Sequence, residues 1–171
     1  LHKAVALGAD RSVHLSDESL AGSDVCATGY SLAKVLEAES PDLVLLGQQS
    51  DDGECYTIGA VVADHLQMPS LTQVIKIDVE DGKLRCERQA EYGYDTVLVE
   101  LPAVISVGDA INEPRYPSLK AIMGAKKKPL DTVSAGDAGI DASKVGTEGS
   151  NVQCGDFKAP PSKSAGTIIE D

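Results

Sequence analysis

Residues 47–58 combine the residue types that hold a phosphate or a ribose. The segment follows a continuous apolar run at 43–46 and precedes a helical pattern. Open α/β sheets bind ligands at such strand-to-helix connections, and the N–H groups and dipole of a helix's first turn favour an anion. Gly53 allows a close backbone approach, and Thr57 supplies a hydroxyl. The segment is therefore predicted to bind a nucleotide.

Three acidic side chains weigh against a phosphate in the same segment. Asp51, Asp52 and Glu54 would repel it, unless they point outward or accept hydrogen bonds from ribose hydroxyls. The alternative is an ordinary connection, in which Asp-Asp-Gly forms a turn and a serine or aspartate caps the helix. Cys55 is expected to be a ligand contact or a bystander rather than a nucleophile.

A second candidate segment lies at 117–128. Leu119, Ile122 and Met123 share one face of a short predicted helix. Such a stripe serves either as an exposed anchor for a partner or as packing against its own domain. Three lysines follow at 126–128, and they are either a solvated charge run or a weak nucleic-acid patch. Arg115 is expected either to tie the loop to its own subunit through a carboxylate such as that of Glu113, or to face a partner subunit.

Other catalytic or metal-binding patterns are missing from the sequence. The histidines are isolated, the cysteines form no CxxC pair, and no P-loop is present. Neither a zinc site nor a disulfide framework is expected, and a hydrolase or synthetase that uses ATP is disfavoured. The residues concerned are His2, His14, His65, Cys26, Cys55, Cys86 and Cys154.

Composition limits the partners. The chain has 171 residues, of which 42% are hydrophobic, so one domain with appendages is expected. The net charge of −12 repels nucleic acid and anionic membranes. No run approaches the length of a membrane span. The first residue is Leu1, within a helical pattern that Gly8 ends, so an N-terminally truncated fragment is expected.

The elements that must position these segments alternate between helix and strand. This order predicts an α/β fold with a doubly wound parallel sheet. A small antiparallel meander follows, with a hairpin turn at Asp81-Gly82 and a second turn at 92–95. From Pro129 onward no period survives, so an extended tail that builds no core alone is expected. Ser23 or Asp24 can cap a predicted helix that runs through Glu39. The other predicted elements are strands at 11–15, 42–47, 71–80, 83–91, 96–101 and 102–107, and helices at 57–66 and 118–126.

Two stretches together resemble the electron transfer flavoprotein beta subunit. The first is residues 42–53, and the second runs from 101–107 through Asn-Glu-Pro-Arg-Tyr at 112–116 to the lysines at 126–128. The resemblance implies a Rossmann-like nucleotide-binding domain at 1–128 with a recognition loop at 107–128. It also implies that the tail at 129–171 packs on an alpha subunit.

The resemblance further implies a buried AMP in this subunit, with FAD held mainly by the alpha subunit. In electron-bifurcating relatives a second FAD takes the place of AMP. The sequence departs from the family pattern at 56–58, where the phosphate contacts are expected. The AMP-binding residues implied are Gly47, Gln48, Gln49, Ser50, Asp51, Asp52, Gly53, Glu54, Cys55, Tyr56, Thr57 and Ile58.

By the same resemblance the protein is an electron carrier without catalytic residues of its own. It would relay electrons from acyl-CoA dehydrogenases of fatty acid beta-oxidation, or related flavoenzymes, to a quinone oxidoreductase. Leu119 matches the anchor that enters the dehydrogenase, with Ile122 and Met123 beside it. The expected location is the bacterial cytoplasm or the mitochondrial matrix. The alternative from a different functional class is an adenine-nucleotide-binding regulatory module like the universal stress proteins.

Overall fold

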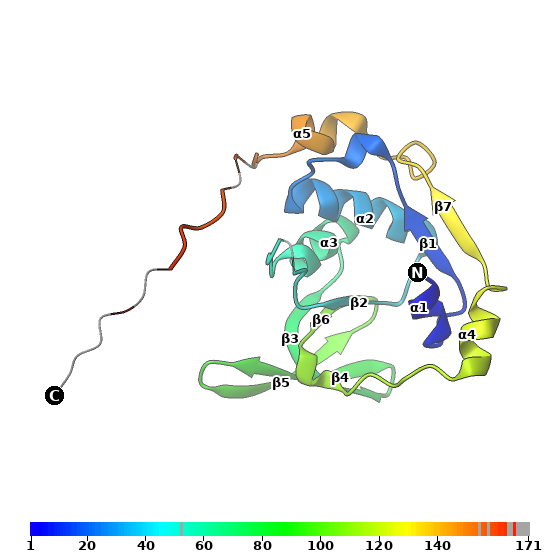
Figure 1. Cartoon of the computed structure of the whole chain (residues 1–171). Helices are drawn as coiled ribbons and strands as arrows, with labels where there is room; N and C mark the ends of the chain where they lie inside the picture. The colour runs from blue at the N-terminus through cyan, green and yellow to red at the C-terminus, as the bar shows by residue number, and fades with distance from the viewer. Residues whose placement is uncertain (52, 154, 157, 164–165, 167–171) are drawn as a thin grey trace.

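The structure is a computed structural model, and it describes residues 1–51, 53–153, 155–156, 158–163 and 166. Helices and strands alternate along the first half of the chain, and the strands form two sheets (Figure 1). The predicted α/β fold with an antiparallel meander is therefore confirmed. Within the described residues, no helix is both long enough and apolar enough to cross a membrane.

The larger sheet has five strands in the order β2-β6-β3-β4-β5. β2 (Leu43–Gly47) and the start of β3 (Ser70–Glu80) run parallel to β6 (Ala103–Val107), one on each side of it. β4 (Lys83–Ala90) and β5 (Gly93–Glu100) continue the sheet as an antiparallel meander. The chain thus joins a parallel half, typical of nucleotide-binding folds, to an antiparallel half.

Two apolar cores cover the two faces of β6. On one face Val104 packs with Val44 and with Val62 of helix α3 (Ile58–Leu66). On the other face Ile105 packs with Leu84 and other apolar residues of the meander. Val104 and Ile105 have no exposed surface, which explains why this strand is apolar at consecutive positions.

One of the two meander turns lies where the sequence predicted it, and the other does not. Asp81 and Gly82 have φ values of 49° and 77°, as a two-residue hairpin turn requires. The second turn was expected at 92–95, but β5 already begins at Gly93. Gly93 has a φ of 136°, a conformation open to glycine, and it pairs with Ala90 of β4. The strand therefore starts three residues earlier than predicted.

Helix α2 (Val25–Glu39) lies against α3 (Figure 1). Its N-terminus is capped by Asp24, whose carboxylate accepts a hydrogen bond of 2.9 Å from the N–H of Ala27. The two helices approach closely at Gly29, where an added Cβ would lie 2.5 Å from Cγ1 of Val61. Glycine at this position sets the spacing between the helices that follow β1 and β2.

The smaller sheet has two parallel strands, β1 (Ser12–Leu15) and β7 (Leu130–Val133). Helix α1 (His2–Ala6) lies beside it and packs against α4 (Leu119–Ala125). Short 3-10 helices at η1 (Glu18–Leu20) and η2 (Asp109–Ile111) follow β1 and β6. The expected helix at 118–126 and the end of the first helix before Gly8 agree with these bounds.

Residues 130–149 differ from the expected extended tail. They form β7, the 3-10 helix η3 (Ala142–Lys144) and α5 (Gly146–Gly149) on the body of the chain. Ala135, Ile140 and Val145 are buried around Tyr30 of α2. The hydroxyl of Tyr30 accepts a hydrogen bond of 3.1 Å from the N–H of Asp141. These apolar residues are too widely spaced in the sequence to show a helix or strand periodicity, but together they form a small core around the Tyr30 ring.

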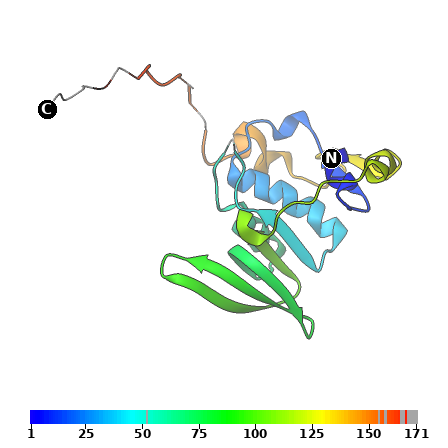
Figure 2. The same cartoon turned by 60° about the horizontal axis from the view of Figure 1, so that its bottom comes forward.

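The chain leaves the body after α5. The described residues of the final segment are exposed from Asn151 onward, and the trace extends away from both sheets (Figures 1 and 2). Figure 2 shows the meander projecting from the parallel half of the molecule, away from α1 and α4.

Candidate functional site

The predicted nucleotide segment joins the carboxyl end of β2 to the start of α3. β2 ends at Gly47 and α3 begins at Ile58, with Thr57 as its N-cap. The side chain of Thr57 makes no capping hydrogen bond, and the first N–H groups of a helix have no partner within the helix. Gly59 permits close packing, because an added Cβ would lie 3.5 Å from the side chains of Leu46 and Ser106. The location predicted from the sequence is the ligand-binding edge of an open sheet.

A cavity of about 340 Å³ opens between this segment and the start of α2. Its volume lies in the range of small-molecule sites. Both walls come from connections that leave the same edge of the fold, one after β1 and one after β2. The lining residues are Ser23, Asp24, Val25, Thr28, Ser50, Gly53, Cys55 and Ile58.

The cavity collects only some of the residues predicted to bind AMP. Ser50, Gly53, Cys55 and Ile58 line it. Asp52 lies outside the described residues. The other described members of the segment are not among the lining residues, and most are exposed: Gly47, Gln48, Gln49, Asp51, Glu54, Tyr56 and Thr57.

The loop itself is held by a few local hydrogen bonds. The N–H of Glu54 donates to the carbonyl of Ser50 at 3.0 Å, and Glu54 has a left-handed φ of 45°. The Cys55 thiol donates to the carbonyl of Gly53 at 3.1 Å. These contacts fold the loop back on itself and place the Ser50 side of the turn against the cavity.

Asp24 is the charged group among the described residues that line the cavity. The N–H of Ala27 lowers its pKa most, and the N–H groups of Asn151 and Val152, at 2.7 and 3.1 Å, lower it further. Since the lining residues include no lysine or arginine, a phosphate there would rely on N–H groups and hydroxyls. An anionic Asp24 instead suits a hydroxyl donor such as a ribose.

Sequence reasoning missed the contribution of α2 to this cavity. The lining residues from the preceding strand-helix unit lie more than twenty residues before Ser50, the first lining residue of the loop. They are Ser23, Asp24, Val25 and Thr28. Asp24 was recognised as a possible helix cap. The usable signal was that helices after successive parallel strands begin at the same edge of a sheet.

The second predicted segment presents its apolar residues to solvent. Leu119, Ile122 and Met123 are 74%, 45% and 65% exposed, and Ala125 is the buried residue of α4. The alternative, in which these side chains pack into their own domain, is wrong for this structure. The other side of α4 packs against α1, where Ala125 clusters with Val5 and Ala6.

Two backbone carbonyls near the end of α1 accept hydrogen bonds from the segments on either side of α4. Arg115 donates to the carbonyl of Leu7, through Nε at 3.1 Å and through Nη2. Lys128 Nζ donates to the carbonyl of Ala9 at 2.7 Å. The expected partner of Arg115 was a carboxylate such as Glu113, and the observed one is the carbonyl left open where α1 ends.

The described residues contain no cluster of histidine, cysteine or acidic side chains that could hold a metal ion. Cys26, Cys55 and Cys86 are free thiols, and burial raises the pKa of the Cys86 thiol. His65 stacks edge-on against Tyr30, with ring centroids 5.5 Å apart.

Comparison with known proteins agrees with the resemblance. Residues 1–138 match the electron transfer flavoprotein domain. The chain is 41% identical to electron transfer flavoprotein subunit beta of Mycobacterium tuberculosis, over 100% of this chain and 65% of the relative. It is 35% identical to the caffeyl-CoA reductase-Etf complex subunit CarD of Acetobacterium woodii and 34% identical to subunit beta of Bos taurus, each over 99% of this chain and 65% of the relative. The chain therefore spans about two thirds of the length of these relatives, and it belongs to the electron transfer flavoprotein family, among its beta subunits.

Proposed function

We propose that this chain is part of the beta subunit of a heterodimeric electron transfer flavoprotein and that it binds AMP in the cavity between α2 and the 47–58 segment. The observation that supports this most directly is that Ser50, Gly53, Cys55 and Ile58, from the segment that the resemblance assigns to the nucleotide, line a cavity. The chain would act as an electron carrier and would have no catalytic residues of its own.

The cavity walls suit an adenosine better than a free anion. Val25 and Ile58 offer apolar surface for a base, and Thr28 and Ser50 offer hydroxyls. Asp24 can accept a hydrogen bond from a ribose hydroxyl. The phosphate would lie toward the uncapped first turn of α3.

The flavin would be held mainly by the alpha subunit. The chain has no tryptophan and one phenylalanine, so it offers little aromatic surface for an isoalloxazine ring. The tail after Val152 is a candidate contact with that subunit, because its described residues are exposed.

The exposed face of α4 is proposed to bind the electron donor. Leu119 and Met123 protrude from a helix that Arg115 and Lys128 fasten to α1. An apolar anchor on a fixed support gives affinity without a large interface, as fast exchange between redox partners requires. Acyl-CoA dehydrogenases or related flavoenzymes would donate the electrons, and a quinone oxidoreductase would accept them.

The test is the composition of the native complex. The native gene product is co-expressed with its alpha subunit, and the nucleotides released on denaturation are identified by mass spectrometry beside the visible spectrum. A yellow heterodimer with one AMP per beta subunit is the expected result. A second FAD in place of AMP would identify the bifurcating type. A colourless homodimer that exchanges ATP would refute the proposal and favour a regulatory module.

A further inference from the structure

Helices α1 and α4 lie side by side, and a cavity of about 560 Å³ opens between them (Figure 1). Its volume lies in the range of small-molecule sites. It shares no lining residue with the cavity between α2 and the 47–58 segment. The groove between α1 and α4 is therefore a second site, separate from the one assigned to the nucleotide.

One face of each helix forms a wall of this groove. His2 and Lys3 precede Ala6 by four and three residues, so the three side chains share a face of α1. Ile122 and Ala125 have the same spacing of three in α4. The two alanines belong to the buried cluster where the helices meet. The floor of the groove is thus built of short side chains, which leave room above it.

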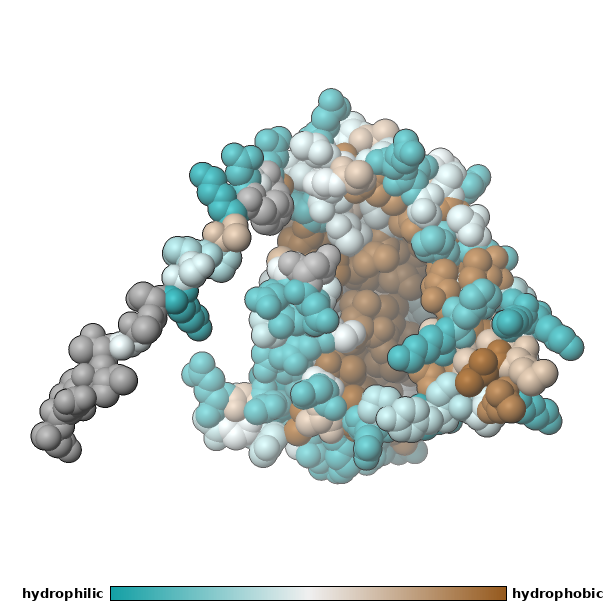
Figure 3. All heavy atoms as spheres, viewed as in Figure 1, coloured by the Kyte–Doolittle hydropathy of each residue, from teal (hydrophilic) through white to brown (hydrophobic). Residues whose placement is uncertain are grey.

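The groove combines apolar surface with positive charge. Pro117 and Ile122 add apolar area to the two alanines, while Lys3 and Lys126 come from opposite walls. Within the described part of the chain no acidic side chain lines the groove, although the net charge of the protein is −12. In the space-filling view, hydrophobic and hydrophilic residues lie next to one another over this pair of helices, at the right of the molecule (Figure 3).

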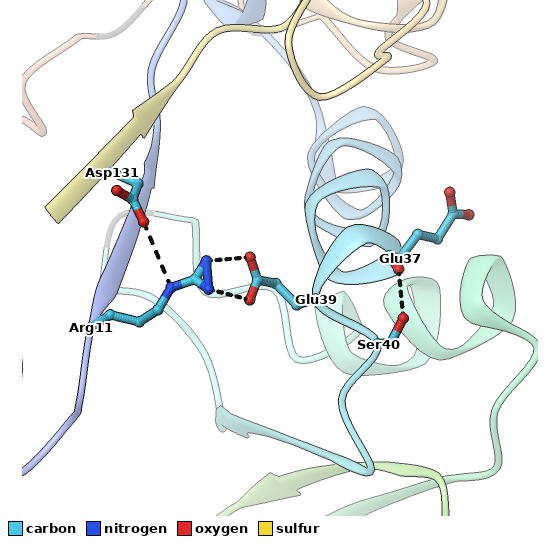
Figure 4. Close-up of polar contacts among 5 residues, drawn as sticks. All are labelled: Arg11, Glu37, Glu39, Ser40 and Asp131. Atoms are coloured by element: carbon cyan, nitrogen blue, oxygen red, sulfur yellow. Dashed lines mark hydrogen bonds and ion pairs between the residues drawn. The ribbon is translucent and has the colours of Figure 1, made fainter. Parts of the chain in front are cut away.

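The charges of the two lysines are not used by the protein's own carboxylates. Arg11 shows the contrast, because it makes a bidentate contact with Glu39 at 3.0 and 2.6 Å and its Nε lies 3.6 Å from Asp131 (Figure 4). Among the described residues, Lys3 and Lys126 take part in no ion pair. Their ammonium groups are therefore available to a bound anion.

Hydrogen bonds at both ends of α4 hold the two walls together. Arg115, before α4, donates to the carbonyl of Leu7, and Lys128, after α4, donates to the carbonyl of Ala9. Both acceptors lie just after α1. The groove is thus formed before a ligand arrives, which lowers the entropy lost on binding.

We infer that this groove binds a single-chain anionic amphiphile, such as a medium-chain fatty-acid anion. The acyl chain lies along Ile122 and the alanine floor, where it leaves water, and the carboxylate lies between Lys3 and Lys126. Because Ile122 also belongs to the exposed face of α4, an occupied groove covers part of the surface proposed for the electron donor. That consequence rests on the proposed function, whereas the binding itself does not.

An amphipathic helix of a partner protein fits the groove less well. Recognition of a helix in a groove uses positions from i to i+7, which span about 10 Å of helix axis. Helix α1 has five residues, so this wall is roughly 8 Å long. The groove is therefore too short for the usual set of helical anchors.

Calorimetric titration with single-chain probes tests the chemistry of the site. Octanoate, decanoate and decyltrimethylammonium are added to the purified protein below their critical micelle concentrations. Each methylene removed from water should tighten binding about threefold, so decanoate should bind about tenfold more tightly than octanoate. The cationic probe should bind more weakly than decanoate. Equal affinities for the two carboxylates, or a cation that binds as tightly as decanoate, would overturn the inference.

A matched pair of charge reversals tests the role of the groove lysines. Lys126→Glu and Lys120→Glu change the net charge equally at opposite ends of α4, and both side chains are exposed, so both variants should fold. Lys126 lines the groove and Lys120 does not. Lys126→Glu should weaken decanoate binding about fivefold, because an attraction becomes a repulsion, and Lys120→Glu less than twofold. Equal losses would show a diffuse attraction and reject the site.

Methyl NMR locates the bound chain. Decanoate should shift the methyl resonances of Ile122 and leave those of Ile58, in the other cavity, unchanged. A shift at Ile58 without one at Ile122 would refute the assignment, as would an acidic amphipathic peptide that binds more tightly than decanoate. None of these measurements uses AMP, flavin or electron transfer, so their failure would leave the proposed function standing.

Discussion

Gly29 should be the position where one added methyl group does most damage to the α2–α3 pair. In Gly29→Ala the new Cβ would lie 2.5 Å from Cγ1 and 3.0 Å from Cβ of Val61, whereas carbon atoms pack at about 3.5–4.0 Å. Val61 is β-branched and has one strongly preferred helical rotamer, so its side chain cannot turn away. The helices themselves must shift.

The magnitude follows from two opposing effects. Overpacking of this kind costs about 1–3 kcal/mol, and alanine gains about 1 kcal/mol over glycine in a helix. Because the backbone has to move, we expect a net loss of about 1–2 kcal/mol in the free energy of unfolding. Gly124→Ala is the matched control, since its Cβ would meet nothing within 4 Å in α4. That variant should be stabilised by up to about 1 kcal/mol, the helix-propensity gain without the overpacking.

Urea unfolding of the two variants and the parent chain measures both effects. If Gly29→Ala is as stable as Gly124→Ala, the close helix contact does not exist in solution. The same shift would move Thr28 relative to Ile58 across the cavity, so Gly29→Ala should also weaken AMP binding. Gly124→Ala should leave AMP binding unchanged.

Three further variants test other contacts. Because hydrogen bonds from Ala27 and then from Asn151 and Val152 lower the pKa of Asp24, its stabilising effect is present above its ordinary value of 3.8 and is lost as pH falls through the lower folded value. Asp24→Asn should remove that part of the pH dependence of the unfolding free energy. It should also speed proteolysis near residue 152, because the hydrogen bonds from Asn151 and Val152 are weakened. An unchanged pH dependence would contradict these hydrogen bonds. Leu119→Ala should slow electron acceptance from the dehydrogenase while AMP content stays at the parent level, and an unchanged rate would reject Leu119 as the anchor. Arg11→Ala should lower the Tm slightly, by less in 1 M salt than at low ionic strength, and a salt-independent effect would argue against the ion pair with Glu39.

Local patterns predicted the elements around the site better than the site itself. The apolar run at 43–46, the Asp24 cap and the Asp81-Gly82 turn each have a physical cause within a few residues. The two walls of the cavity are far apart in sequence. The loop pattern predicted Ser50 and Ile58 as site residues, but no pattern indicated that the start of α2 forms the other wall.

The segment after Pro129 was misjudged for a related reason. Ile140 and Val145 belong to no periodic pattern, and their burial depends on Tyr30, more than a hundred residues earlier. For helix α4, one of the two alternatives expected the apolar stripe to pack against its own domain, whereas the structure exposes it. A helical stripe alone does not say whether a partner or the same domain covers it.

The Tyr30 cluster makes the end of the domain match at residue 138 a poor place to cut the chain. The family match ends at residue 138, yet Ile140 and Val145 close over the aromatic ring further on. Grafting residues 1–138 onto another scaffold would leave that ring facing water and would remove the backbone N–H groups that Asp24 accepts from at 151 and 152. A hybrid joined after residue 152 keeps both, and this position is where swapping of tails between family members should begin.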